Sequence, residues 1–193
     1  VLVVGFGNSG GEIALDLAEY GARTTMAVRS PVNIMPREAL GIPLVSITLA
    51  FRWLPTALLD RVGGVIQRLR IGDLGGYGLR MRADGPATQI AREARIPLID
   101  LGTVNLIKSG AIQVRPGISQ FTRDGVAFTD GTSGRFDTVI LATGYRPGLG
   151  FLDPEVVPAD AKQLPVKGAS ASPHGLFFAG FNVTSTGTLR QIG

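Results

Sequence analysis

VLVVGFGNSGGEIALDLAEYGARTTMAVRS (Val1 to Ser30) is the stretch of sequence that decides the fold. It opens with an apolar run, meets a glycine-rich turn at residues 5–10, continues with a helical pattern and ends in a second strand-like run at residues 24–28. Strand, glycine turn, helix and strand in this order are typical of a dinucleotide-binding unit. The alternative, a tight turn without a ligand, is disfavoured because all four elements agree.

The three glycines of this turn have separate predicted tasks. Gly5 allows the sharp turn out of the strand, Gly7 allows a pyrophosphate to approach the main chain, and Gly10 allows the helix to pack closely. The N–H groups at the start of the helix then face the phosphates, and Ser9 either caps the helix or donates to a phosphate oxygen. The buried face of the helix is predicted to comprise Ile13, Ala14, Leu17 and Ala18.

The end of the second strand indicates which cofactor is bound. An NAD site usually has Asp or Glu there, about 20 residues after the glycines, to bind the ribose 2′-OH. Residues 20–37 contain no acid, and Arg29 follows the strand instead. A guanidinium binds a 2′-phosphate with two hydrogen bonds. NADP is therefore favoured over NAD, and the alternative is that Arg29 is simply solvated.

The composition is that of a folded globular protein, with 45% hydrophobic and 18% charged residues. The net charge of +4 comes from scattered basic residues, so nucleic-acid binding is not expected. The chain has no Cys and one His, which argues against a disulfide, a metal site or a Cys-based redox centre. No leader peptide is visible, and we expect a cytoplasmic location for a piece whose upstream portion is missing.

A helical pattern dominates the region that follows. Two helical pieces split at Pro55 are expected within residues 43–70, and the second has an apolar face made of Leu58, Val62, Val65, Ile66 and Leu69. The apolar stretch 41–59 is short for a bilayer span and is interrupted, so a buried or interfacial hairpin is favoured over membrane contact. A glycine-rich loop and short helices at 88–95 and 103–108 come next.

The period then changes to that of strands. Residues 112–115, 118–123 and 126–129 are interpreted as a small antiparallel meander with Gly-containing turns. FDTVILATGYRP (Phe136 to Pro147) follows and predicts a buried strand that ends in small residues, where the main chain passes close to a flat ligand. On its own this motif is also compatible with an ordinary buried strand. A last buried strand is expected at residues 176–180.

Several stretches together give the chain a resemblance to the flavin-dependent monooxygenases with two dinucleotide domains. They are similar, in order and spacing, to the YUCCA-type branch of the class B flavin-containing monooxygenases. The stretches are GNSG, VRSPVNIMPRE (Val28 to Glu38), GDLGGYGL (Gly72 to Leu79), IPLIDLGTVNLIKSGAIQV (Ile96 to Val114) and FDTVILATGYRP.

The resemblance implies an α/β fold with two parts. Residues 1–144 would form a Rossmann-like, three-layer NADP(H)-binding domain with a parallel sheet and a small antiparallel meander. Residues 145–193 would return to a second Rossmann-like domain, which binds FAD. By position, the residues that bind NADP(H) would be Gly5, Gly7, Asn8, Ser9, Gly10, Arg29 and Ser30. Those beside the crossover and the flavin would be Thr143, Gly144, Tyr145 and Gly180, with the turn at 186–188.

The resemblance also implies the reaction. NADPH would reduce FAD, and a C4a-(hydro)peroxyflavin formed with molecular oxygen would oxygenate a lipophilic or aromatic small molecule. The outcome would be N- or S-oxygenation, or oxidative decarboxylation of an acid such as indole-3-pyruvate. Few catalytic side chains are expected, because the flavin carries the chemistry. The oligomeric state is left open.

The chain departs from the family pattern at its start. Both the FAD glycine motif and the FxGxxxH fingerprint are absent, so the fragment alone is expected to be inactive. Two alternatives stay open: an NADPH-dependent flavoprotein reductase without oxygen insertion, and a nucleotide-binding module that needs a partner chain.

Overall fold

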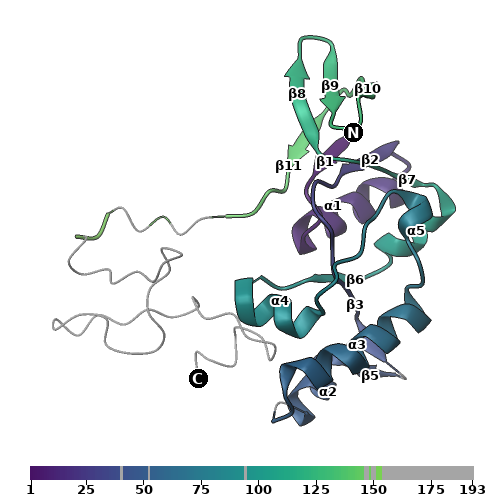
Figure 1. The fold of residues 1–193 in the computed structure, drawn as a ribbon. Coiled ribbons are helices and arrows are strands. Elements are labelled where there is room, and N and C mark those ends of the chain that lie inside the picture. Colours follow the sequence, from purple (N-terminus) through teal and green to yellow (C-terminus); the bar gives the residue numbers. More distant parts are fainter. Residues whose placement is uncertain (40, 52, 94, 146–147, 149–150, 154–193) are drawn as a thin grey trace.

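A four-stranded parallel sheet is the centre of the computed structural model, which describes residues 1–39, 41–51, 53–93, 95–145, 148 and 151–153 (Figure 1). Its strand order is β11-β1-β2-β7, and every neighbouring pair is parallel. The strands are β1 (Leu2–Val4), β2 (Thr24–Ala27), β7 (Ile112–Arg115) and β11 (Val139–Leu141). Helix α1 (Asn8–Glu19) connects β1 to β2, which confirms the strand, turn, helix and strand predicted for the first thirty residues.

The sheet is the middle of three layers. Helices α1 and α5 (Thr103–Ser109) cover one face, where a buried cluster includes Val3, Ala14, Met26, Val104, Ile107 and Ile112. Strands β8 (Ile118–Thr122), β9 (Gly125–Phe128) and β10 (Ser133–Gly134) form an antiparallel meander on the other face. There the buried residues are Leu2, Ala27, Val126 and Phe128. Side chains alternate between the two faces of a strand, so β1 and β2 each supply residues to both clusters. The predicted three-layer α/β fold is confirmed.

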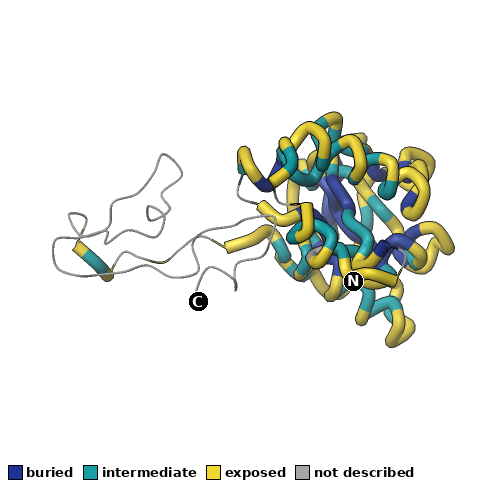
Figure 2. The backbone as a smooth tube through the Cα atoms, turned by 90° about the horizontal axis from the view of Figure 1, so that it is seen from below, coloured by how far each residue is buried: buried dark blue, intermediate teal, exposed yellow. Residues whose placement is uncertain are grey.

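The buried segments lie in the middle of the part formed by β1 to β11, and exposed segments surround them (Figure 2). In Figure 1 the meander lies at one end of this part, and the helices α2 (Leu44–Ala50) and α3 (Thr56–Arg70) lie at the other.

The prediction was wrong about the partner of residues 112–115. We expected them to open the meander, but they form β7 and pair with β2 in the parallel sheet. Alternation of apolar and polar residues identifies a strand but not its neighbour. Helix α5 precedes β7 and returns the chain across the sheet, which allows parallel pairing. The third strand of the meander is β10 instead.

The strand predicted at residues 136–141 is shorter and more exposed than expected. Strand β11 pairs only with β1 among the described residues, so it forms an edge of the sheet. Val139 is 36% exposed and Leu141 is 66% exposed, which contradicts the prediction of a buried strand within the part of the chain that is described. Residues 176–180, where another buried strand was predicted, lie outside the described residues.

Two small strand pairs were not predicted. Strand β3 (Ile34–Pro36) pairs in parallel with β6 (Leu98–Asp100). Strands β4 (Glu38–Ala39) and β5 (Ile42–Pro43) form a short hairpin. Its turn contains Gly41 at φ +77°, a left-handed conformation that glycine adopts without strain. Runs of two or three residues are too short to show a period.

The helical region has the predicted break, since α2 ends before Pro55 and α3 begins after it. The region continues with a 3₁₀ turn (Gly75–Tyr77) and α4 (Pro86–Glu93). The carboxylate of Asp60 on α3 accepts hydrogen bonds from the N–H of Ala87, at 2.7 Å, and from the N–H and hydroxyl of Thr88 at the start of α4. This contact joins α3 to the start of α4.

The apolar face of α3 is largely exposed, although Ile66 on it is half-buried. Its residues Leu58, Val62, Val65 and Leu69 are 42%, 50%, 56% and 81% exposed. These four side chains are therefore not part of the core that the described residues form. No helix among the described residues has both the length and the apolar character needed to cross a membrane.

Candidate functional site

The candidate site lies where the carboxyl ends of β1 and β11 meet. From β1 the chain continues to β2 on one side, whereas β11 lies on the other side, and ligands of open α/β sheets bind at such a switch point. Gly5 has φ +116°, and a side chain there would overlap the carbonyl oxygen of Ala142. The structure therefore brings the glycine turn and the ATGY segment, which lie far apart in the sequence, side by side.

The remaining glycines of the turn differ in the space around them. A Cβ atom on Gly10 would lie 2.6 Å from the carbonyl oxygen of Gly5, so this position is closed. Gly7 is exposed, and no atom lies within 4 Å of where its Cβ would be. The first N–H groups of a helix have no acceptor within it. Donors and open space thus coincide at Gly7, where we predicted the approach of a pyrophosphate.

Asn8 and Ser9 lie in the first turn of α1 and differ in what they contact. The carboxamide of Asn8 bonds to the main chain of Pro97 and Ile99, so its side chain has a structural task. Gly7 is the N-cap residue and no side chain caps the helix, so the capping role considered for Ser9 is wrong. Its exposed hydroxyl is compatible with the other role, donation to a phosphate.

Arg29 and Ser30 are exposed and follow β2 closely. The N–H of Gly5 donates to the carbonyl oxygen of Ala27 at 3.1 Å, so the end of β2 lies beside the glycine turn. The guanidinium of Arg29 forms no ion pair with any residue that the structure describes. Its binding of a phosphate stays a prediction.

The side chain of Arg80 and the main chain of Arg115 lie near the end of β2, and the sequence analysis missed both. Nη2 of Arg80 donates to the carbonyl oxygen of Arg29 at 3.4 Å, and the N–H of Val28 donates to the carbonyl oxygen of Arg115 at 2.8 Å. Arg80 comes near because Val32 and Met81 form an isolated parallel bridge. Arg80 lies 51 residues along the chain from Arg29, so only knowledge of the bridge between Val32 and Met81 could have placed it there.

Thr143, Gly144 and Tyr145 continue directly from β11 on the same side of the sheet as the glycine turn. Gly144 has φ +96°, which redirects the chain, and the side chain of Tyr145 is 99% exposed. Gly180 and the turn at 186–188 lie outside the described residues.

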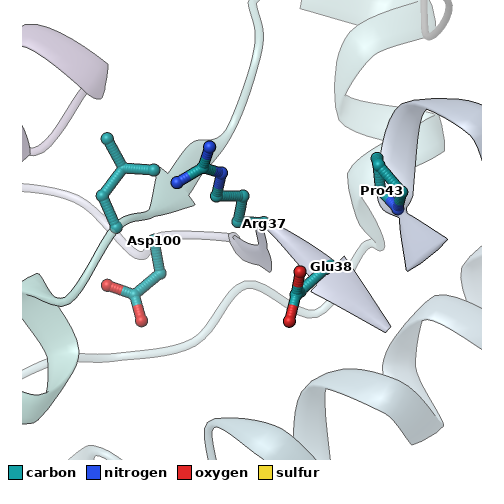
Figure 3. A pocket seen from close by; sticks show the side chains of 5 residues that line it. Arg37, Glu38, Pro43 and Asp100 are labelled. Carbon is teal, nitrogen blue, oxygen red and sulfur yellow. The ribbon is translucent and has the colours of Figure 1, made fainter. Parts of the chain in front are cut away.

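An open surface hollow of about 420 Å³ lies at the carboxyl ends of β3 and β6 (Figure 3). Its lining residues are Arg37, Glu38, Pro43, Asp100 and Leu101. Oδ1 of Asp100 accepts the N–H groups of Gly102 and Val104 at 3.1 and 3.0 Å, which fixes the carboxylate at the start of α5.

Comparison with known families shows which family the chain belongs to. The family model described as flavin-binding monooxygenase-like matches residues 1–167. The chain belongs to this family. Its glycine turn, its Arg29 and its ATGY segment all lie within the matched region.

Curated relatives from plants show which branch of the family the chain is similar to. The chain is 47% identical over 147 residues to indole-3-pyruvate monooxygenase YUCCA1 of Oryza sativa subsp. japonica, which covers 76% of this chain and 36% of the relative. It is 40% identical over 191 residues to YUCCA8 of Oryza sativa subsp. indica, which covers 94% of this chain and 45% of the relative. The chain thus spans less than half the length of these relatives.

Solved structures share the fold. A flavin-containing monooxygenase from Stenotrophomonas maltophilia aligns with a TM-score of 0.51 at 21% identity, over 98% of this chain and 46% of that one. A cyclohexanone monooxygenase mutant from Rhodococcus sp. Phi1, described as bound to NADP⁺, aligns with a TM-score of 0.53 at 16% identity, over 78% of this chain and 40% of that one.

Proposed function

We propose that this chain is the NADPH-binding part of a flavin-dependent monooxygenase that oxygenates a small organic substrate. The observation that carries the proposal is an unpaired arginine, Arg29, beside an open glycine cradle in a member of the flavin-binding monooxygenase family. NADPH supplies reducing equivalents, and the bound flavin supplies the oxygen chemistry. The residues of this chain bind and orient the electron donor.

Charge selects the electron donor in this account. The guanidinium of Arg29 binds the 2′-phosphate with two hydrogen bonds, and the hydroxyl of Ser30 contributes a further donor. Arg80 adds positive charge beside Arg29 and is proposed to strengthen the preference. The first-turn N–H groups of α1 and the hydroxyl of Ser9 bind the pyrophosphate that approaches Gly7.

The domain division follows from this assignment. Residues 1–144 form the NADP(H) domain, and residues 145–193 return to the FAD domain, which brings Thr143, Gly144 and Tyr145 to the crossover between the cofactors. Gly180 then lies near the flavin. A lipophilic or aromatic substrate is proposed because relatives of the YUCCA branch are named for indole-3-pyruvate, an aromatic 2-oxo acid. The cytoplasmic location stays a prediction.

The test uses the protein encoded by the complete gene. NADPH should bleach the bound flavin in the absence of oxygen, and oxygen should then yield an oxygenated or decarboxylated product from indole-3-pyruvate, an amine or a thioether. Flavin reduction without any such product, and with hydrogen peroxide as the sole outcome, would favour the reductase alternative. A protein that binds NADPH but no flavin would favour the nucleotide-binding module.

A further inference from the structure

The turn between β7 and β8 contains a buried glycine, Gly117, that lies against Arg29. Gly117 does not have a positive φ, so the left-handed conformation that favours glycine is not the reason for a glycine here. The three atoms nearest to where its Cβ would lie all belong to Arg29, with Cγ at 3.1 Å, Cβ at 3.2 Å and Cα at 3.3 Å. The missing side chain therefore leaves room for the stem of Arg29.

The main chain on both sides of this contact is fixed by hydrogen bonds. The N–H of Val28 donates to the carbonyl oxygen of Arg115 at 2.8 Å, which holds the end of β2 against the end of β7. The N–H of Thr129 donates to the carbonyl oxygen of Gly117 at 2.8 Å, which holds the turn against the meander. Carbon atoms in ordinary contact lie about 3.5–4.0 Å apart. A side chain on Gly117 would therefore push the stem of Arg29 aside.

The stem and the head of Arg29 have different surroundings. Its first carbon atoms lie against Gly117, whereas the residue as a whole is exposed. An arginine often packs its stem on the protein and leaves its guanidinium in water. Such packing removes conformations of the side chain before a ligand binds, and a binding group that is ordered in advance loses less entropy on binding. Contact with Gly117 thus favours binding by the guanidinium.

We infer that Gly117 is a positioning residue for the 2′-phosphate of NADPH. Because it has no side chain, the stem of Arg29 lies on the turn and the guanidinium stays at the end of β2, beside the glycine cradle. Gly117 acts only through Arg29, so its effect is confined to a cofactor that carries this phosphate. The inference rests on the proposed function, since it names a residue that sets how strongly the same site prefers NADPH.

The experiment measures binding of NADP⁺ and NAD⁺ to the full-length protein by calorimetric titration. The oxidised cofactors are the probes because they cannot reduce the flavin. Gly117→Val should weaken NADP⁺ binding about 10-fold and leave NAD⁺ binding little changed, since the guanidinium is displaced from the 2′-phosphate. Gly117→Ala should give a smaller loss in the same direction, and it replaces Gly117→Val if that variant does not fold.

A matched control and a second background separate a positioning role from a structural one. Gly76→Val should leave the affinity for both cofactors unchanged, because Gly76 is exposed and no described atom lies within 4 Å of where its Cβ would be. In the Arg29→Ala protein, Gly117→Val should cause no further loss of NADP⁺ affinity, because the guanidinium that it displaces is already absent.

Three results would overturn the inference. They are an unchanged NADP⁺ affinity in Gly117→Val, an equal loss of NADP⁺ and NAD⁺ affinity, and the same loss of NADP⁺ affinity with and without the side chain of Arg29. The last two would show that Gly117 supports only the fold. Equal affinities of the unchanged protein for NADP⁺ and NAD⁺ would refute the proposed NADP site, and the inference with it, so the two failures can be told apart.

Discussion

Asn8 and Ile99 are joined by a hydrogen bond of 2.8 Å, in which the N–H of Ile99 donates to Oδ1 of Asn8. Nδ2 of the same carboxamide donates to the carbonyl oxygen of Pro97 at 3.3 Å. One side chain therefore binds the main chain of the β6 segment much as a neighbouring strand would. This makes Asn8 a positioning residue at the start of α1, within the glycine turn.

Loss of this carboxamide should loosen β6. In Asn8→Ala the N–H of Ile99 loses its acceptor, and we expect a loss of about 1–3 kcal/mol in the free energy of unfolding. Hydrogen exchange at Ile99 should become faster in the nucleotide-free protein. Ser9→Ala is the matched control, because that hydroxyl is exposed and no side chain caps the helix. Equal exchange rates at Ile99 in both variants would refute the positioning role.

The glycine turn offers a pair of substitutions with opposite effects. Gly5→Ala places a side chain against Ala142 at a positive φ, and it should destabilise the fold by at least about 2 kcal/mol. Gly7→Ser should fold normally, because Ser suits the N-cap position and the extended φ of −94° strains no residue. It should nevertheless weaken NADPH binding, since the new side chain fills the cradle.

Urea unfolding and NADPH titration of the two variants check this contrast. A Gly7→Ser protein that binds NADPH as tightly as the parent would place the pyrophosphate elsewhere.

Acidic pH should weaken one ion-pair cluster. Arg82 contacts Asp84 at 2.7 Å and Glu93 at 2.6 Å, and its guanidinium lowers the pKa of Asp84 below the ordinary value. A lowered pKa in the folded state contributes stability above the ordinary pKa near 4, and this contribution is lost as the pH falls through the folded-state pKa. The side chains are partly exposed, so the effect should be about 0.2–1 kcal/mol.

The measurement is the free energy of unfolding of Asp84→Asn and of the parent at pH 7 and pH 3. The difference between the two proteins should shrink at the lower pH. A difference that grows on acidification would contradict the assignment.

The exposed apolar face of α3 gives a test of the packing. In the 193-residue chain, Val65→Ser should change the stability by less than about 0.5 kcal/mol, because Val65 is 56% exposed. Leu79→Ala should cost about 2–5 kcal/mol, because Leu79 is fully buried in the main cluster. Similar losses in the two variants, measured by thermal unfolding, would mean that the face of α3 packs inside this chain.

The sequence predicts the β1-α1-β2 unit well because both signals are local. The apolar run and the glycines from Gly5 to Gly10 fix the turn, and the spacing of apolar residues fixes the helix. Pairing is not local, so residues 112–115 could be recognised as a strand and still be given the wrong neighbour. The contact of Asn8 with Ile99 spans 91 residues, and nothing in the spacing of either residue announces it.

In the candidate site, too, local features could be predicted from the sequence and long-range contacts could not. The position of Arg29 after β2 follows from the strand that precedes it, whereas Arg80 reaches it through a bridge between Val32 and Met81. Helix α3 contacts α4 through Asp60, whose partners lie 27 and 28 residues along the chain. A helical pattern shows which residues share a face, but the partner decides whether that face points inward.

Calorimetric titration of the full-length protein with NADPH and NADH tests the central claim, that Arg29 and the glycine cradle form an NADP site. NADPH should bind at least about 10-fold more tightly than NADH. Arg29→Ala should lower the NADPH affinity by about 1–3 kcal/mol and leave NADH little changed, because only NADPH has the 2′-phosphate. Equal affinities of the unchanged protein for NADPH and NADH would contradict the account.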